Sequence, residues 1–165
     1  MILGIDIGVT GCLVILDESE GFKYIDHLHM PITTLHTKKR VNGAEISRWI
    51  DPYYENIKGA FVELVNGMPS QKDGVKMGAG SAFSFGHSAG VIEGLLQGAL
   101  LPYYTVTPSV WKRNAGLIGK QKDASRSLAI RLYPEIADLS LKAKGQALAD
   151  AIFIARCAIK PLDLV

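Results

Sequence analysis

The sequence predicts an α/β fold in which helices cover both faces of a mixed five-stranded sheet. The first thirty residues read as three strands separated by turns, which is typical of an antiparallel meander. Two later strand-like runs alternate with helical patterns, which favours parallel strands joined to the meander. With 165 residues, 48% of them hydrophobic, the chain has the size and composition of one domain covering residues 1–165.

The meander is justified by apolar runs and by the turn signals between them. "MILGIDIG" is apolar on both faces, as expected of a central strand. "CLVILDES" and "FKYIDHLHM" follow it across Thr-Gly at 10–11 and Glu-Gly at 20–21. A loop rich in Thr and Lys comes next, and its basic cluster, Lys38, Lys39 and Arg40, precedes the first predicted helix.

A helix, a strand and a loop are predicted in the middle of the chain. Residues 42–58 carry apolar side chains at helical spacing, and Pro52 is expected to kink this helix. "GAFVELV" then reads as a short apolar strand. Residues 66–81 are polar and rich in glycine, so we expect a loop there.

The second half of the chain predicts one strand and four helices. The helix predicted over Ala82–Leu101 has a glycine at every fourth position, which forms a ridge that a sheet or a second subunit can approach closely. "PYYTVTP" reads as a strand, and Pro108 suits the first turn of the next helix, with Thr107 or Ser109 near its cap. "KQKDASRSLAIRLYP" and "GQALADAIFIARCAI" predict the last two helices.

Three acids lie within apolar runs, namely Asp6, Glu63 and Asp150. Burying an unpaired carboxylate costs several kcal/mol or more, so each needs a compensating partner. Asp6 has a local alternative as a turn cap, and Glu63 could face water from an edge strand. Carboxylates that converge from distant segments are typical ligands of hard cations such as Mg²⁺, which favours phosphate chemistry.

The net charge of +2 is less informative than the position of the charges. Between residues 112 and 131 one acid, Asp123, accompanies six cations. These are Lys112, Arg113, Lys120, Lys122, Arg126 and Arg131. Such a cluster is either a solvated face or a phosphate-binding surface, and the three acids favour the second interpretation.

The cysteines show no zinc spacing, and the histidines show no metal spacing coordinated with the three acids. Cys12 and Cys157 have no partner spacing for zinc and are expected to be buried packing residues. The histidines are expected to be surface or structural residues; they are His27, His29, His36 and His87. No apolar run reaches the roughly 20 residues that cross a bilayer, so we expect a soluble, intracellular protein.

Four features in order resemble one protein family across essentially the whole chain. They are "GIDIGxTG", a glutamate in a central strand, "TPxxWK" with further lysines, and "ADAIFIA" near the C-terminus. This combination resembles the RuvC-type Holliday junction resolvases of the ribonuclease H-like superfamily. The resemblance implies a ribonuclease H-like nuclease domain, and a homodimer that acts on branched DNA in the cytoplasm of a bacterial or phage-infected cell, or in an organelle.

The resemblance also implies an activity. A crossover junction endodeoxyribonuclease resolves four-way junctions by paired symmetric nicks that leave 5′-phosphate and 3′-hydroxyl ends. Asp6, Glu63 and Asp150 match the family's ligands for two Mg²⁺ ions, which Mn²⁺ can replace. Lys112 and Lys122 match its catalytic lysines, and Lys120 suits the second position equally well. The implied DNA-binding residues are Lys112, Arg113, Lys120, Lys122 and Arg126.

Two positions depart from the family pattern. The family commonly has a fourth metal ligand one helical turn before the last aspartate, where this chain has Ala147. Gln146 or Lys144 could point the same way, but neutral Gln is a poorer ligand than a carboxylate, so we expect weaker metal binding.

The second departure concerns an aromatic that some relatives carry just after the glutamate, where it stacks on bases at the crossover. Met68, Phe83 and Phe85 are the candidates to replace it here.

Two other activities fit parts of the pattern. The same acids could serve a nuclease that cuts flaps, forks or packaging intermediates. "DIGVTG" also opens the nucleotide-binding domains of sugar kinases and Hsp70-like ATPases. That module would need a second domain and another glycine-rich phosphate loop, and a chain of 165 residues has room for neither.

Overall fold

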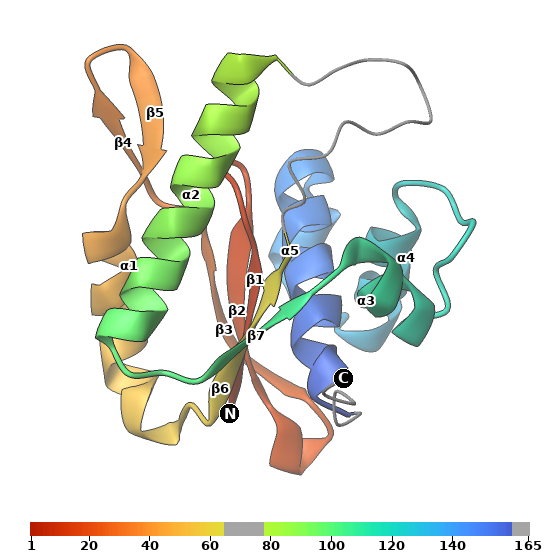
Figure 1. Cartoon of the computed structure of the whole chain (residues 1–165). Helices are drawn as coiled ribbons and strands as arrows, with labels where there is room; N and C mark the ends of the chain where they lie inside the picture. The colour runs from red at the N-terminus through yellow and green to blue at the C-terminus, as the bar shows by residue number, and fades with distance from the viewer. Residues whose placement is uncertain (65–77, 160–165) are drawn as a thin grey trace.

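A mixed five-stranded sheet forms the centre of the protein (Figure 1). The computed structural model describes residues 1–64 and 78–159. The strand order is β3-β2-β1-β6-β7. The strands are β1 (Ile2–Asp6), β2 (Cys12–Asp17), β3 (Lys23–His29), β6 (Gly59–Glu63) and β7 (Tyr103–Val106). Because β1, β2 and β3 pair antiparallel while β6 and β7 run parallel to β1, the predicted sheet is confirmed.

Helices cover both faces of this sheet, also as predicted (Figure 1). One face carries α1 (Gly43–Ile50) and α2 (Ala79–Gly98), and the other carries α3 (Pro108–Asn114), α4 (Ala124–Leu132) and α5 (Lys142–Ala155). Short 3-10 helices also occur in the described residues: η1 (Glu18–Glu20), η2 (Asp51–Asn56), η3 (Ala137–Ser140) and η4 (Arg156–Ile159).

The two faces of β1 contribute to two separate hydrophobic cores. Leu3 and Ile5 pack towards α1 and α2, whereas Ile2 points to the face covered by α5. Gly4 lies on the α5 face, where an added Cβ would sit 2.3 Å from the carbonyl oxygen of Ala151. The absence of a side chain at Gly4 therefore lets α5 lie directly on β1, which positions the site described below.

Several local features read from the sequence agree with the structure, although the helices α2, α4 and α5 differ by a few residues from the predicted ranges. The first predicted helix changes to 3-10 geometry at Asp51, directly before Pro52. Thr107 caps α3, its hydroxyl oxygen accepting a hydrogen bond from the Val110 amide. Cys12 and Cys157 are free and buried, as expected. Within the described residues, no helix is both long and apolar enough to cross a membrane.

The prediction of a loop before α1 was wrong. β4 (Ile32–Leu35) and β5 (Lys38–Val41) form a separate hairpin there, so the basic cluster Lys38, Lys39 and Arg40 lies on a strand. β4 is exposed along its whole length, so no buried face imposed an apolar pattern that the sequence could reveal.

The boundary of the next predicted loop also differed. α2 begins at Ala79, so the last residues of the loop expected over 66–81 are helical. Residues 65–77, which include Met68, lie outside the described residues.

Candidate active site

Three carboxylates from distant segments converge at the ends of β1 and β6. Ile5 pairs with Val62 in parallel register, so Asp6 and Glu63 follow at the same level of adjacent strands. Asp150 comes from α5, which packs across β1. The charges interact, since both Glu63 and Asp150 raise the pKa of Asp6.

Burial disfavours ionisation of all three acids, and repulsion by a neighbouring carboxylate adds to this effect at Asp6 and Glu63. Desolvation, reinforced by the charges of Glu63 and Asp150, raises the pKa of Asp6 to about 8. Desolvation also raises the pKa of Glu63 and that of Asp150. Nearby Lys112 opposes the increase at both groups, although burial remains the larger effect. Without a cation, three negative charges at this place are unfavourable.

Buried Trp111 orients Glu63. Its indole Nε1–H donates to Oε1 of Glu63 at 2.9 Å, and only 2% of the Trp111 residue is exposed. The Lys112 ammonium lies 5.1 Å from the centroid of the Trp111 ring, within cation–π range. Consecutive residues of α3 therefore fix the carboxylate and supply a positive charge beside it.

Two polar side chains orient Asp150. The Ser125 hydroxyl of α4 donates to Oδ1 of Asp150 at 2.6 Å, and Nε2 of Gln146 donates to the same oxygen at 2.9 Å. Gln146 precedes Asp150 by four residues, so both lie on one face of α5. Gln146 thus points towards the site from beside Ala147, whereas Lys144 does not line the cleft.

The site opens into a cleft of about 800 Å³. Its lining includes Asp6 and Asp150, and the cations Lys122, Arg126 and Lys142. Lys122 also lowers the pKa of Asp150 through its charge, whereas Lys120 does not line the cleft. The geometry therefore favours Lys122 over Lys120 at the second lysine position. Arg113 is exposed and lies outside the cleft lining.

The donor set fits hard cations. Oxygen donors from three carboxylates suit Mg²⁺ or Mn²⁺ rather than softer metals. The carboxylate oxygens of the three acids do not all lie within 4.8 Å of one another. Among the described residues, the only group of three potential ligands that does is His27, His29 and Asp138. The wider spacing of the three acids suits ligands shared between two ions, which lie roughly 3.5–4 Å apart in two-metal sites.

A second basic surface lies beside the turn that follows β1. Lys38, Lys39 and Arg40 of β5 line a cavity of about 480 Å³ together with Val9 and Phe83. Phe83 is 64% exposed, and the Arg40 guanidinium stacks 5.4 Å from its ring centroid.

Phe85 is less exposed than Phe83 and faces Gly8 in the same turn. Of the aromatic candidates for base stacking, Phe83 is therefore the one presented to solvent.

Sequence reasoning missed several groups of this site. It did not single out Trp111, Ser125 or Lys142 as contributors. The "TPxxWK" motif contains Trp111 and was the available signal for it. Ser125 and Lys142 carry no local pattern, because their role depends on how α4 packs against α5.

Trp111→Phe is expected to lower the affinity for Mg²⁺ about 10–100-fold while the protein stays folded, because Glu63 loses the donor that orients it. Isothermal titration with Mg²⁺ measures this change. Trp49→Phe is the matched control, since Trp49 donates to Asp26 on the other face of the sheet. Equal Mg²⁺ affinities in the two variants would contradict this role of Trp111.

Comparison with known proteins supports the fold. No family model and no curated protein matches the sequence. The structure of Thermus thermophilus RuvC with a Holliday junction substrate aligns with a TM-score of 0.55 and 17% identity, covering 93% of this chain and 88% of that one. A second Thermus thermophilus RuvC structure aligns with a TM-score of 0.51 and 17% identity, covering 95% and 96%. The expected fold is thus confirmed as one that this chain shares with RuvC.

Proposed function

We propose that this protein is a structure-selective, metal-dependent DNA endonuclease that resolves four-way junctions by paired symmetric nicks. One observation carries the proposal: three half-buried carboxylates meet in a RuvC-like fold, and two of them, Asp6 and Asp150, line a cleft together with cations. A phosphodiester is the substrate that such a combination of acids, metal and cations suits best. The RuvC neighbour that was solved with a Holliday junction substrate favours the four-way junction.

The mechanism assigns the acids to metal binding and the lysines to charge stabilisation. Asp6, Glu63 and Asp150 would hold two Mg²⁺ ions. The chemistry that such ions would supply is activation of a water and stabilisation of the attacking and leaving oxygens, with a 5′-phosphate and a 3′-hydroxyl as the expected ends. The charge of Lys112 lowers the pKa values of Glu63 and Asp150, and that of Lys122 lowers the pKa of Asp150. Both lysines are therefore close enough to these acids to stabilise negative charge on a phosphate bound there.

We assign orientation of the metal-binding acids to their neutral neighbours. Trp111, Ser125 and Gln146 hold Glu63 and Asp150 by hydrogen bonds and add no charge to the site. Gln146 takes the place beside Ala147 where a fourth ligand is common in the family. A neutral amide there is consistent with weaker metal binding.

The second basic surface is proposed to bind the arms of the junction. Phe83→Ala should weaken junction binding about 5–150-fold, because stacking of a base on an aromatic ring contributes about 1–3 kcal/mol. Phe83→Tyr keeps the ring and should bind like the unmodified protein. A binding titration with metal replaced by Ca²⁺ measures both variants, and equal loss in both would exclude stacking.

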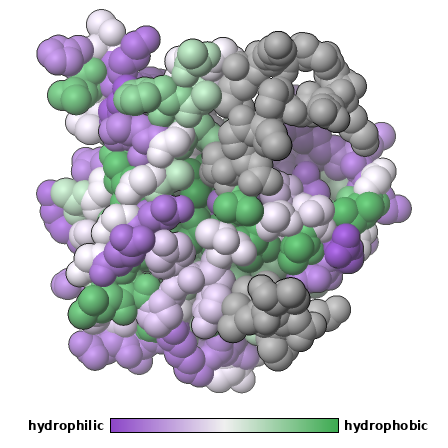
Figure 2. Space-filling model, in the orientation of Figure 1, coloured by the Kyte–Doolittle hydropathy of each residue, from purple (hydrophilic) through white to green (hydrophobic). Residues whose placement is uncertain are grey.

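We propose that α2 forms the homodimer interface. Gly86, Gly90, Gly94 and Gly98 are exposed, and a Cβ added at any of them would meet nothing within 4 Å among the described residues. The glycine ridge therefore does not pack against the sheet, which leaves close approach by a second subunit as its role. Figure 2 shows pale and hydrophobic residues over α2, while hydrophilic residues gather at the hairpin and along the lower edge. Paired nicks across a junction need two active sites related by a two-fold axis.

Gly90→Lys should convert the dimer to a monomer, because it places a charged side chain on the glycine ridge. Lysine is a better helix former than glycine, so α2 itself should not be weakened. Leu132→Lys, at an exposed position of α4, is the control. Sedimentation velocity measures the mass, and an unchanged dimer in Gly90→Lys would place the interface elsewhere.

The direct test of the function compares four substrates in Mg²⁺: a four-way junction, a flap, a fork and linear duplex. We expect two symmetric nicks in the junction, with ends that a ligase can seal. Preferential cutting of flaps or forks would support a related branched-DNA nuclease instead. Cleavage of linear duplex at the same rate as the junction would overturn structure selectivity.

A further inference from the structure

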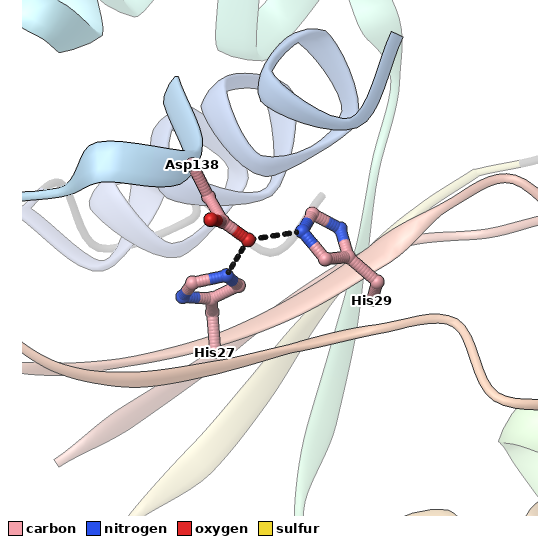
Figure 3. Close-up of side chains that lie close together, drawn as sticks. All are labelled: His27, His29 and Asp138. Atoms are coloured by element: carbon pink, nitrogen blue, oxygen red, sulfur yellow. Dashed lines mark hydrogen bonds and ion pairs between the residues drawn. The ribbon is translucent and has the colours of Figure 1, made fainter. Parts of the chain in front are cut away.

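Two histidines and one aspartate converge at the edge of the sheet, away from the three acids. His27 and His29 are two residues apart on β3, so their side chains project from the same face. Asp138 reaches them from η3, more than one hundred residues later in the chain. Figure 3 shows both imidazoles pointing at one carboxylate oxygen. That oxygen, Oδ2 of Asp138, lies 3.2 Å from His27 Nε2 and 2.9 Å from His29 Nε2.

We propose that His27, His29 and Asp138 form a second metal site, which binds a transition-metal ion such as Zn²⁺. Two ligands that each lie about 2.0–2.1 Å from a tetrahedral zinc are about 3.3 Å apart. The two nitrogen–oxygen separations, 3.2 Å and 2.9 Å, are shorter than this ligand–ligand spacing by a few tenths of an ångström at most. Small side-chain movements would therefore admit an ion in place of the two shared protons. Two imidazoles with one carboxylate and an open fourth position are a ligand set that suits zinc.

The surroundings of the cluster support coordination. The Tyr24 hydroxyl lies 2.7 Å from Nδ1 of His27, so it holds the ring with Nε2 directed at Asp138. With Nε2 on a metal, the Nδ1–H would donate to the Tyr24 oxygen, which is the outer contact usual for a metal-bound histidine. The His27 and His29 side chains are 15% and 23% exposed and that of Asp138 is 41% exposed. An ion and a water can therefore reach the site from solvent.

This site is distinct from the three-acid site. His29 pairs with Cys12 on β2, and Cys12 pairs with Asp6 on β1. Adjacent strands lie about 4.8 Å apart, so about 10 Å of sheet separates His29 from Asp6. Two ions of one active site lie only about 3.5–4 Å apart. The proposal rests on the histidine nitrogens and does not depend on the nuclease activity.

The site would link two segments that are far apart in the chain. β3 is the edge strand of the sheet, and η3 leads into α5, which carries Gln146 and Asp150. Because the three ligands assemble only in the folded protein, zinc binding stabilises the native state. At a free zinc concentration about 100 times Kd, the midpoint of thermal unfolding should rise by about 5–10 °C.

The experiment titrates metal-free protein with Zn²⁺ in excess Mg²⁺, which occupies the carboxylate site. We expect one zinc per chain by calorimetry, a higher unfolding midpoint, and visible absorption typical of tetrahedral Co²⁺ when cobalt replaces zinc. His29→Gln keeps a hydrogen-bond donor for Asp138 but lacks the imidazole, and it should bind zinc at least about tenfold more weakly.

Two further variants locate the ion. His36→Asn, on the exposed turn of the hairpin, should bind zinc like the unmodified protein, and so should Asp6→Asn. Equal zinc affinity in His29→Gln and the unmodified protein would overturn the proposal, because the cluster would then be a hydrogen-bonded contact only. Loss of zinc binding in Asp6→Asn instead would assign the ion to the three-acid site.

Discussion

Asp6→Asn is expected to lower the rate of junction cleavage at least about 1,000-fold and, without metal, to stabilise the protein. The activity falls because an amide replaces a charged metal ligand at the centre of the three acids. The stability rises because Asp6 is buried beside Glu63 and Asp150, which repel its charge. A residue kept for stability alone would not show these opposite effects.

The stability difference should grow with pH. Burial and repulsion raise the pKa of Asp6 to about 8 in the folded state, against 3.8 for the ordinary group. Between these two values the folded state holds a proton that the unfolded state has released, so the free energy of unfolding decreases as pH rises. The destabilisation is absent below about pH 4 and complete above about pH 8. Asn carries no such proton, so its advantage reaches several kcal/mol at pH 8, with about 5 kcal/mol as the upper bound.

Denaturant unfolding in EDTA at pH 5 and pH 8 measures this difference. Mg²⁺ should narrow it, because the ion stabilises the ionised Asp6 of the unmodified protein. Asp51→Asn, at an exposed acid, is the control and should change neither activity nor stability. The stability difference between Asp6→Asn and the unmodified protein could instead be the same at both pH values. That result would mean that the Asp6 charge is not buried as assigned.

Gly4→Ala is expected to destabilise the protein by about 1–3 kcal/mol or more, which is the usual range for overpacking a core. The new Cβ would lie 2.3 Å from the Ala151 carbonyl oxygen and 2.6 Å from the Ala155 Cβ. Because backbone atoms of α5 cannot move aside as a flexible side chain can, the whole helix must shift. Asp150 moves with it, so we also expect a lower affinity for Mg²⁺.

Thermal or denaturant unfolding and a Mg²⁺ titration measure both effects. Gly80→Ala on α2 is the matched control, since its Cβ would meet nothing within 4 Å among the described residues. It should be neutral or slightly stabilising, because alanine favours a helix over glycine. Unchanged stability in Gly4→Ala would mean that α5 does not need the close approach to β1.

Much of the fold could be predicted because burial leaves a periodic pattern in sequence. The apolar run around Asp6 identified a central strand, and Pro108 marked the start of α3. The hairpin β4–β5 was missed, since a strand exposed on both faces has no such pattern. The start of α2 at Ala79 was missed because its N-cap residue, Gly78, has no side chain that could form a capping hydrogen bond and mark the helix end.

The five-stranded sheet and the three acids that need a compensating charge were predictable from the amino-acid pattern. A buried charge in an apolar run conflicts with its local surroundings, so it is visible without a structure. The groups that surround these acids could be identified only from the packing of the helices on the sheet. Trp111 meets Glu63 across 48 residues, and His29 meets Asp138 across 109. Such contacts arise from how elements pack, which no local pattern records, and they define both the orientation of the acids and the second cluster.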